Sequence, residues 1–267
     1  MEQVEIDLEV DGVEVHISAL RRRGPAPTLV CLHGFGSTKE DYADLAIHPS
    51  FADRDLVMFD APGCGRSEIT DPAALSIPFL VETALAVIDH LGVDRFHVSG
   101  HSMGGLTALM LAREHPDRVR SFFDIEGNLA PEDCFLSRQI IEFPADGPDA
   151  FFDAFVARVA ERDEYASRLY AATLAAKVRP TSVGPIFRSM VEISDSLPLL
   201  DIMARLPFPK TFVYGEQNRH LSYLADLPAL GVEVVEIAAS AHFPMYSNPP
   251  ALWAAMADFL ASADRRP

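Results

Sequence analysis

The sequence Gly-His-Ser-Met-Gly at residues 100–104 could carry nucleophilic chemistry, because it places a serine between two glycines in a G-x-S-x-G pattern. It follows an apolar run at residues 95–99 and precedes a helical pattern at residues 106–113. A serine on a sharp strand-to-helix turn takes a strained backbone, and only small residues two positions away let the strand and helix approach so closely. We therefore predict that Ser102 is presented as a nucleophile.

A serine hydroxyl is a weak nucleophile and needs a base within hydrogen-bonding reach. Among the nine histidines, His242 is the preferred candidate, because it follows the last apolar strand pattern and precedes the final helical pattern. Loops at the carboxyl ends of parallel strands gather at one edge of a sheet, where the serine would also lie. His220 is a weaker second candidate, His97 alternates with apolar residues as a core histidine does, and His101 adjoins the serine and should point elsewhere.

A second glycine-rich loop, His-Gly-Phe-Gly-Ser at residues 33–37, follows the apolar strand pattern at residues 28–32. Glycines after a strand let the backbone approach a ligand closely. Acyl transfer needs two preorganised N–H donors that face the charge developing on a carbonyl oxygen. We predict that the backbone amides of Phe35 and Met103 form this oxyanion hole.

Strand and helix patterns alternate along most of the chain and would position these loops. Two alternating patterns at residues 4–10 and 13–17 flank Asp11 and Gly12, a hairpin signal. Continuous apolar runs, typical of strands buried on both faces, occur at residues 28–32, 56–59, 96–99, 119–125, 210–214 and 232–237. Helical periodicity occurs at residues 75–91, 102–115 and 249–261. This alternation predicts an α/β protein with a mostly parallel, doubly wound sheet.

The alternation stops in a segment at residues 128–206, where the pattern is helical at about residues 131–142, 148–162, 164–177 and 182–193, with prolines as punctuation. We predict that residues 128–206 form a helical cap over the site, and that residues 1–127 and 207–267 form the core domain. Most aromatic side chains of this segment should pack in its own core. Phe135, Phe143 and Phe187 are the candidates for contact with substrate.

The order of these motifs resembles that of the α/β-hydrolase fold family. The H-G-F-G-S loop, the G-H-S-M-G-G elbow, the Asp-Ala-Pro-Gly-Cys-Gly-Arg-Ser segment at residues 60–67 and the late histidine occur in that order. The resemblance covers essentially the whole chain and implies an eight-stranded α/β-hydrolase sheet with an all-helical cap insertion. It is specific for the superfamily but not for a substrate, since this scaffold hosts many reactions. In relatives the segment at residues 60–67 ties loops together, so a structural role is expected for Arg66 and Ser67.

The third member of the expected catalytic triad departs from the commonest family pattern. Relatives usually carry an aspartate after the penultimate strand, where this chain has Asn218. A neutral amide can hold an imidazole but cannot stabilise an imidazolium. Some superfamily members take the acid from the end of the strand that corresponds to residues 119–125, beside Glu126. We therefore predict Glu126 as the orienting acid, and Asp124 and Glu216 remain alternatives.

Composition argues against several classes of partner. With 39 acidic and 22 basic residues the net charge is −17, which disfavours nucleic acid and anionic membrane surfaces. The sequence contains no run of about 18 apolar residues, so no membrane span is expected. The acidic, strand-like N-terminus does not resemble a signal peptide, and three separated cysteines suggest reduced thiols, so a cytoplasmic location is expected. The sequence shows no zinc-type spacing, and no metal or organic cofactor is implied.

Together these residues predict a serine hydrolase of the carboxylic ester hydrolase class, acting on a small to medium apolar ester through an acyl-enzyme intermediate. A serine nucleophile argues against haloalkane dehalogenase or epoxide hydrolase chemistry, which needs a carboxylate nucleophile. Cleavage of a carbon–carbon bond in a vinylogous diketone, thioesterase or lactonase activity, and a non-catalytic ligand receptor remain open, the last supported only by Asn218. The oligomeric state, monomer or homodimer, is not set by the sequence.

Overall fold

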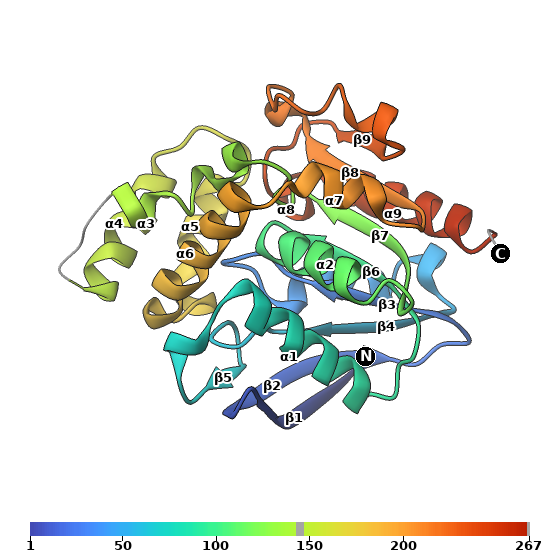
Figure 1. Cartoon of the computed structure of the whole chain (residues 1–267), viewed down its shortest axis with the longest axis horizontal. Helices are drawn as coiled ribbons and strands as arrows, with labels where there is room; N and C mark the ends of the chain where they lie inside the picture. The colour runs from blue at the N-terminus through green and yellow to red at the C-terminus, as the bar shows by residue number, and fades with distance from the viewer. Residues whose placement is uncertain (143–146, 266–267) are drawn as a thin grey trace.

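A nine-stranded sheet forms the centre of the computed structural model, which describes residues 1–142 and 147–265 (Figure 1). Eight strands follow one path in the order β1-β2-β4-β3-β6-β7-β8-β9, and the short strand β5 pairs with β2. The eight strands expected from the sequence match this path, and β5 is added to it. The strands are β1 (Glu2–Val10), β2 (Val13–Arg22), β3 (Ala26–Leu32), β4 (Arg54–Phe59), β5 (Glu68–Ile69), β6 (Phe96–His101), β7 (Val119–Ile125), β8 (Lys210–Gly215) and β9 (Glu233–Ile237).

The predicted hairpin forms the outer edge of the sheet. Asp11 and Gly12 have φ angles of 50° and 79°, which suits a two-residue turn, and they join β1 to β2 in an antiparallel pair. Along β1 the side chains of Gln3, Glu5, Asp7 and Glu9 are exposed, and the side chains between them pack toward the protein. Strand β2 is also antiparallel to β4 and β5, whereas every pair from β4 to β9 is parallel.

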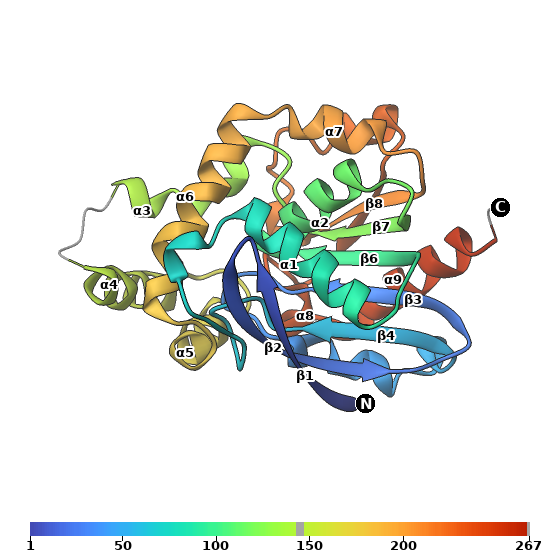
Figure 2. The ribbon, with the colours of Figure 1, turned by 60° about the horizontal axis from the view of Figure 1, so that its bottom comes forward.

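Helices cover both faces of the sheet, which explains why its central strands are continuous apolar runs. All residues of β4 and β6 are buried. The helices α1 (Ile77–His90) and α2 (Met103–Glu114) pack on one face, and α9 (Pro249–Ala263) packs on the other (Figures 1 and 2). The shorter elements are η1 (Lys39–Ala46), η2 (Pro49–Phe51), η3 (Pro72–Ala74), η5 (Glu216–Asn218), η6 (Leu227–Leu230) and α8 (Pro244–Ser247).

The described part of the segment between β7 and β8 consists of helices joined by turns and loops, without a named strand, as expected. Its elements are η4 (Pro131–Phe135), α3 (Gln139–Glu142), α4 (Pro148–Ala160), α5 (Ser167–Lys177), α6 (Pro180–Ser196) and α7 (Leu199–Arg205). Helices α3 to α6 gather beyond one end of the sheet, whereas α7 packs beside α2 (Figure 1). The division of the chain into a core domain and a cap at residues 128 and 206 stays a prediction.

Pro185 lies inside α6, within the helix that was expected at residues 182–193. The helix begins at Pro180, where a proline fits the first turn, and continues through Pro185. A proline inside a helix removes one backbone hydrogen bond and clashes with the preceding turn. Packing offsets that cost here, since Ile186, Phe187 and Met190 directly beyond the proline are buried.

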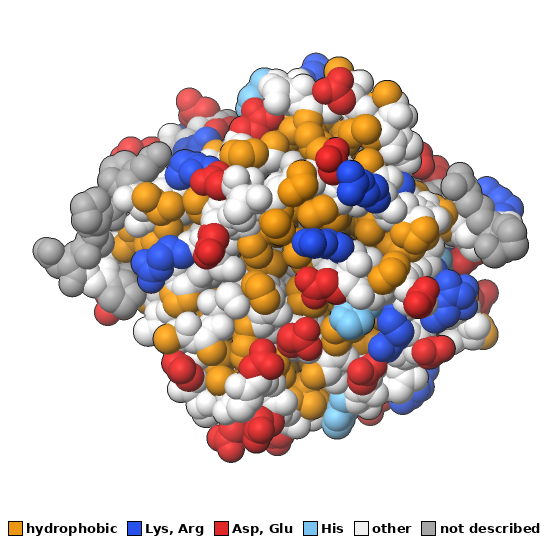
Figure 3. Space-filling model, in the orientation of Figure 1, with side chains coloured by type: hydrophobic (Ala, Val, Ile, Leu, Met, Phe, Trp, Pro, Cys, Tyr) orange, Lys and Arg blue, Asp and Glu red, His pale blue; other side chains and the backbone are white. Residues whose placement is uncertain are grey.

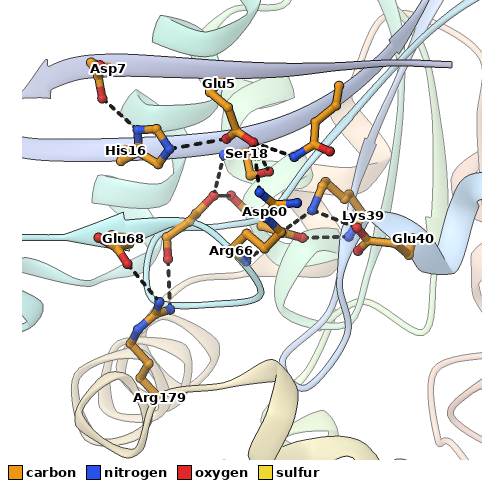
Figure 4. Close-up of polar contacts among 12 residues, drawn as sticks. Glu5, Asp7, His16, Ser18, Lys39, Glu40, Asp60, Arg66, Glu68 and Arg179 are labelled. Carbon is orange, nitrogen blue, oxygen red and sulfur yellow. Dashed lines mark hydrogen bonds and ion pairs between the residues drawn. The ribbon is translucent and has the colours of Figure 1, made fainter.

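Asp60 organises the loop between β4 and β5, which contacts the helical segment through Arg179 (Figure 4). Its carboxylate accepts hydrogen bonds from the backbone amides of Lys39 and Arg66 and from Lys39 Nζ at 2.7 Å. Ser67 Oγ donates to the Asp60 carbonyl, and Arg179 of the helical segment donates to the Ser67 carbonyl. These contacts support the structural role expected for Ser67, whereas Arg66 contributes its backbone amide and its side chain is 66% exposed.

The acidic surface and the free cysteines are those expected from the excess of acidic residues and the separated cysteines in the sequence. Acidic side chains are spread over the face shown in Figure 3 rather than gathered into one patch. No helix in the described part of the chain is long and apolar enough to cross a membrane. Cys31, Cys64 and Cys134 are free and buried. Burial raises the pKa of the Cys64 thiol to about 12, which disfavours a reactive thiolate.

Candidate active site

Ser102 lies on a strained turn between β6 and α2, with φ of 52° and ψ of −116°. A Cβ atom on Gly100 would lie 2.2 Å from the Gly104 carbonyl oxygen, and one on Gly104 would lie 2.2 Å from the Leu32 carbonyl oxygen. Only glycine fits at these two places. The tight strand–turn–helix predicted from the sequence is therefore confirmed, and it brings the start of α2 against the end of β3.

His242, in the loop between β9 and α8, faces this serine. Its Nε2 atom lies 3.0 Å from Ser102 Oγ, and its Nδ1 atom lies 3.4 Å from Glu126 Oε2. A carboxylate at Nδ1 favours the tautomer with its proton on that atom, which leaves Nε2 to accept the serine proton. The structure thus brings the three predicted residues into one contact chain.

Glu126 follows β7 on a left-handed backbone with φ of 51°. Its Oε1 atom accepts from the Gly215 amide at 2.6 Å, and its Oε2 atom accepts from Asn218 Nδ2 at 2.8 Å. The amide at the position where relatives usually carry an aspartate therefore contacts the carboxylate. Both donors come from the end of β8 and the turn after it, so this neighbouring segment fixes Glu126 toward His242.

The two alternative acids lie elsewhere. Asp124 is fully buried against Gly105 and Gly127, and burial raises its pKa well above the usual range. Glu216 accepts from the Ala239 amide at 2.8 Å. Among the described residues, Glu126 is the carboxylate in contact with the His242 ring.

Burial shifts the pKa values of both Glu126 and His242. It raises the pKa of Glu126, while the Gly215 amide and Asn218 lower that pKa by donating to the carboxylate. Burial lowers the pKa of His242, and the nearby positive charge of Arg162 lowers it further. The neutral imidazole, which is the form able to accept a proton, is favoured as a result.

His33 fixes the glycine-rich loop after β3. Its Nε2 atom accepts from the Ala61 amide at 2.8 Å, so the ring proton is on Nδ1, which donates to the Gly34 carbonyl at 2.8 Å. In a trans peptide the carbonyl and the following N–H point in opposite directions. The Phe35 N–H is therefore directed away from the His33 ring. The Met103 amide lies in the first turn of α2, where amides have no partner within the helix.

Two contributors were not predicted from the sequence. His101 Nε2 donates to the His242 carbonyl at 2.7 Å and so holds the loop that carries the base. Tyr170, from α5, donates to the Phe35 carbonyl at 3.0 Å, and its ring stacks on Phe243 at 4.3 Å. No sequence signal separates Tyr170 from the other aromatic residues of the segment. Alternation along β6 places His101 on the same face as Ser99, but it does not indicate a contact with the loop that carries His242.

Two cavities meet at this site. The smaller, of about 20 Å³, is lined by Ser102, His242 and a ring of mostly apolar residues: Phe35, Asp133, Phe135, Leu136, Ser137, Tyr170, Phe187, Met190 and Phe243. The larger, of about 350 Å³, lies on the other side of His242 and includes Glu126, Asn218 and Arg162 in its lining. The Phe135 ring borders both cavities, 5.1 Å from the His242 ring.

The remaining predicted residues are distributed as follows. Phe187 lines the smaller cavity, 4.5 Å from the Phe35 ring, and Phe143 lies outside the described residues. His220 borders the larger cavity, and its Nδ1 lies 3.2 Å from the Gln217 carbonyl rather than at the serine. His97 is a core residue as expected, bonded to Ser121 Oγ at 2.7 Å.

A doubly wound sheet with a serine on a glycine-flanked turn defines the α/β-hydrolase class of fold. The model of the alpha/beta hydrolase fold family matches residues 27–175. The chain belongs to this family.

Individual relatives are more distant. The chain is 33% identical over 133 residues to a protein carrying the name of a carbamate hydrolase, from Pseudomonas savastanoi pv. phaseolicola, covering 48% of this chain and 51% of the relative. It is 33% identical over 131 residues to a pimeloyl-acyl-carrier-protein methyl ester esterase of Aeromonas hydrophila, covering 49% and 47%. The chain therefore spans about half the length of the curated relatives it matches.

Among solved structures, a thermophilic esterase from Thermogutta terrifontis superposes with a TM-score of 0.77 at 19% identity, over 97% of this chain and 99% of that one. At this identity the likeness shows the fold alone. It extends the shared architecture to the helical segment and the last strands, beyond the residues that the family model matches.

Proposed function

We propose that the protein is a serine hydrolase that cleaves a small to medium carboxylic ester through an acyl-enzyme intermediate. The observation that carries this proposal is the contact chain from Ser102 Oγ through His242 to Glu126. A serine so placed has the base that its hydroxyl needs, and the base has a carboxylate that orients it. The proposal includes no metal or organic cofactor.

The reaction would run in two halves. His242 Nε2 takes the Ser102 proton while Oγ attacks the ester carbonyl, and the amides of Phe35 and Met103 stabilise the oxyanion. The tetrahedral intermediate collapses as His242 returns the proton to the departing alcohol. Water then gives a proton to His242 and attacks the acyl-serine, and collapse releases the acid and restores the Ser102 hydroxyl. Glu126 stabilises the imidazolium in both halves.

The relatives support the type of bond rather than a substrate. Those reported above are named for hydrolysis of a methyl ester and of a carbamate, both of which present a carbonyl next to oxygen or nitrogen. The apolar lining contributed by Phe35, Phe135 and Phe187 beside Ser102 supports an apolar part in the substrate.

Covalent labelling tests the proposal directly. A fluorophosphonate should add to the protein once, at Ser102, as seen by intact mass and peptide mapping. Ser102→Ala should abolish both labelling and turnover of an ester panel, whereas Ser50→Ala, at an exposed serine, should change neither. A folded protein that is not labelled contradicts the proposal and favours a ligand receptor. Turnover of a vinylogous diketone, with esters untouched, would favour carbon–carbon cleavage.

A further inference from the structure

The two cavities beside Ser102 differ greatly in size, and from this we infer which side of the ester is large. The inference rests on the proposed ester hydrolysis. We propose that the substrate joins a short acyl group, of about acetyl size, to a considerably larger alcohol that carries no negative charge. Phe187 and Met190 of α6 would set the limit on the acyl group.

The smaller cavity has little room for an acyl chain. Its volume of about 20 Å³ is close to the space that one water molecule needs. Phe187 and Met190 line it and are 2% and 4% exposed. The Phe187 ring is packed between those of Phe35 and Phe155, with centroids 4.5 Å and 5.6 Å away, so it cannot turn aside without disturbing both.

The larger cavity has the size of an ordinary ligand pocket, about 350 Å³. It is reached past His242 and Phe135, and its lining includes Glu126 and Asn218 on the side of the imidazole away from the small cavity. A group in this cavity would therefore lie on the imidazole side of the scissile bond.

The chemistry assigns one half of the ester to each cavity. The departing alcohol oxygen must receive its proton from His242 Nε2, so the alcohol leaves on the imidazole side, toward the larger cavity. The acyl group stays bonded to Ser102 Oγ, and Ser102 lines only the smaller of these two cavities. The acyl chain is therefore the half that the small cavity restricts.

The charges in the larger cavity disfavour an anionic alcohol. Arg162 is held by Glu164 at 2.6 Å, and its guanidinium lies 5.5 Å from the centre of the Phe135 ring. Glu132 also lines the cavity and accepts from Ser222. An anionic alcohol would meet four acidic side chains, those of Glu126, Glu132, Asp133 and Glu164, and an arginine that is already paired. Apolar and hydrogen-bonding groups, in contrast, find partners in the same lining.

Two substrate series test the inference. In 4-nitrophenyl esters of lengthening acids, kcat/KM should fall at least tenfold from acetate to butanoate and further to hexanoate. In acetates of primary alcohols, from ethyl to 2-phenylethyl and larger, kcat/KM should rise or stay level, since leaving-group pKa hardly changes along the series. Met190→Ala should raise the ratio of kcat/KM for the hexanoate to kcat/KM for the acetate at least tenfold.

Met203→Ala is the matched control, because Met203 is equally buried but lies in α7 and lines neither cavity. It should lower stability by a similar amount and leave the hexanoate-to-acetate ratio within twofold of wild type. Wild-type preference for hexanoate, with turnover still dependent on Ser102, overturns this inference and leaves the proposed hydrolase standing. Absence of both ester turnover and Ser102 labelling overturns both.

Discussion

Asn218 and Glu126 show how one exchanged side chain alters the chemistry around a histidine. The Asn218 amide donates to Glu126 Oε2 at 2.8 Å. An aspartate at residue 218 would instead bring a second carboxylate to that oxygen, and like charges so close cannot both stay ionised. The neutral amide at residue 218 therefore suits a carboxylate that arrives from the end of β7.

Glu126→Gln should lower kcat by more than tenfold, because an amide cannot stabilise the imidazolium and can favour the wrong histidine tautomer. Asn218→Ala should lower kcat by less than fivefold, since the carboxylate and its Gly215 donor remain. Steady-state kinetics on one ester, with circular dichroism to verify folding, gives the comparison. The reverse ranking would remove Glu126 from the role of orienting acid.

His33 should affect the rate through the Phe35 amide, without touching substrate. His33→Ala frees the Gly34 carbonyl to rotate, so we expect kcat to fall about tenfold, within the loss of roughly 3 kcal/mol known for a missing oxyanion donor. KM should stay within threefold. His33→Asn, whose amide can donate to the Gly34 carbonyl, should recover part of the loss. A change confined to KM or to thermal stability would argue for a merely structural histidine.

At the residue scale, the sequence indicates which residues can take part in catalysis better than it indicates which side chains contact one another. Ser102, His242 and Glu126 are predictable because each follows a strand at the same sheet edge, where the fold brings loops together. The bond from Asn218 to Glu126, and those of His101 and Tyr170, depend on side-chain directions that spacing does not specify. Phe135 and Phe187 were predicted to contact substrate, and both line the smaller cavity with Ser102, although only packing decides which aromatic residues of the segment do so.

At the scale of elements, buried strands were the most predictable feature, because a strand covered on both faces must be apolar throughout. The helices α7 and α8 and the short 3-10 helices other than η4 were not predicted, because elements of so few residues show no recognisable periodicity. Prolines do not mark element ends uniformly, since Pro180 starts α6 and Pro185 lies within it, inside the helix predicted at residues 182–193. The low helix propensity of a single residue is outweighed by the free energy gained when the neighbouring apolar side chains of the helix are buried.

The loop around Asp60 offers a stability test at this scale. Lys39 and Asp60 are 1% and 0% exposed, and removing one partner leaves a buried, unpaired charge. Asp60→Ala should lower the free energy of unfolding by about 3–5 kcal/mol. Glu40→Gln removes the exposed partner of the same lysine and should cost less than about 1 kcal/mol. Urea denaturation of the two variants decides, and equal losses would contradict a special role for Asp60.

At the scale of the whole molecule, the sheet edge and the helical segment together enclose the base. His242 is covered by Phe243 and His101 from the sheet side and by Phe135 from the helical segment. Neither part alone would bury the imidazole on all these sides. The titration of His242 is therefore a property of the assembled fold.

The acid limb of the kcat/KM profile should reflect this enclosure. A protonated imidazole cannot accept the serine proton, and burial lowers the pKa of His242, so activity should persist below the ordinary histidine value of about 6.5. Arg162→Gln removes a positive charge that lowers this pKa and should move the limb to higher pH. A limb that does not move, or that moves to lower pH, would contradict the charge assignment.

The exposed acids of β1 have a consequence for self-association. An outermost strand offers free backbone groups to which a second molecule could add by extending the ladder. Glu5, Asp7 and Glu9 line that margin, so an antiparallel copy would bring carboxylates opposite one another. Replacement of these three acids by neutral side chains (Glu5→Gln, Asp7→Asn and Glu9→Gln) is therefore the change after which edge-to-edge association of the intact protein should first become detectable by light scattering.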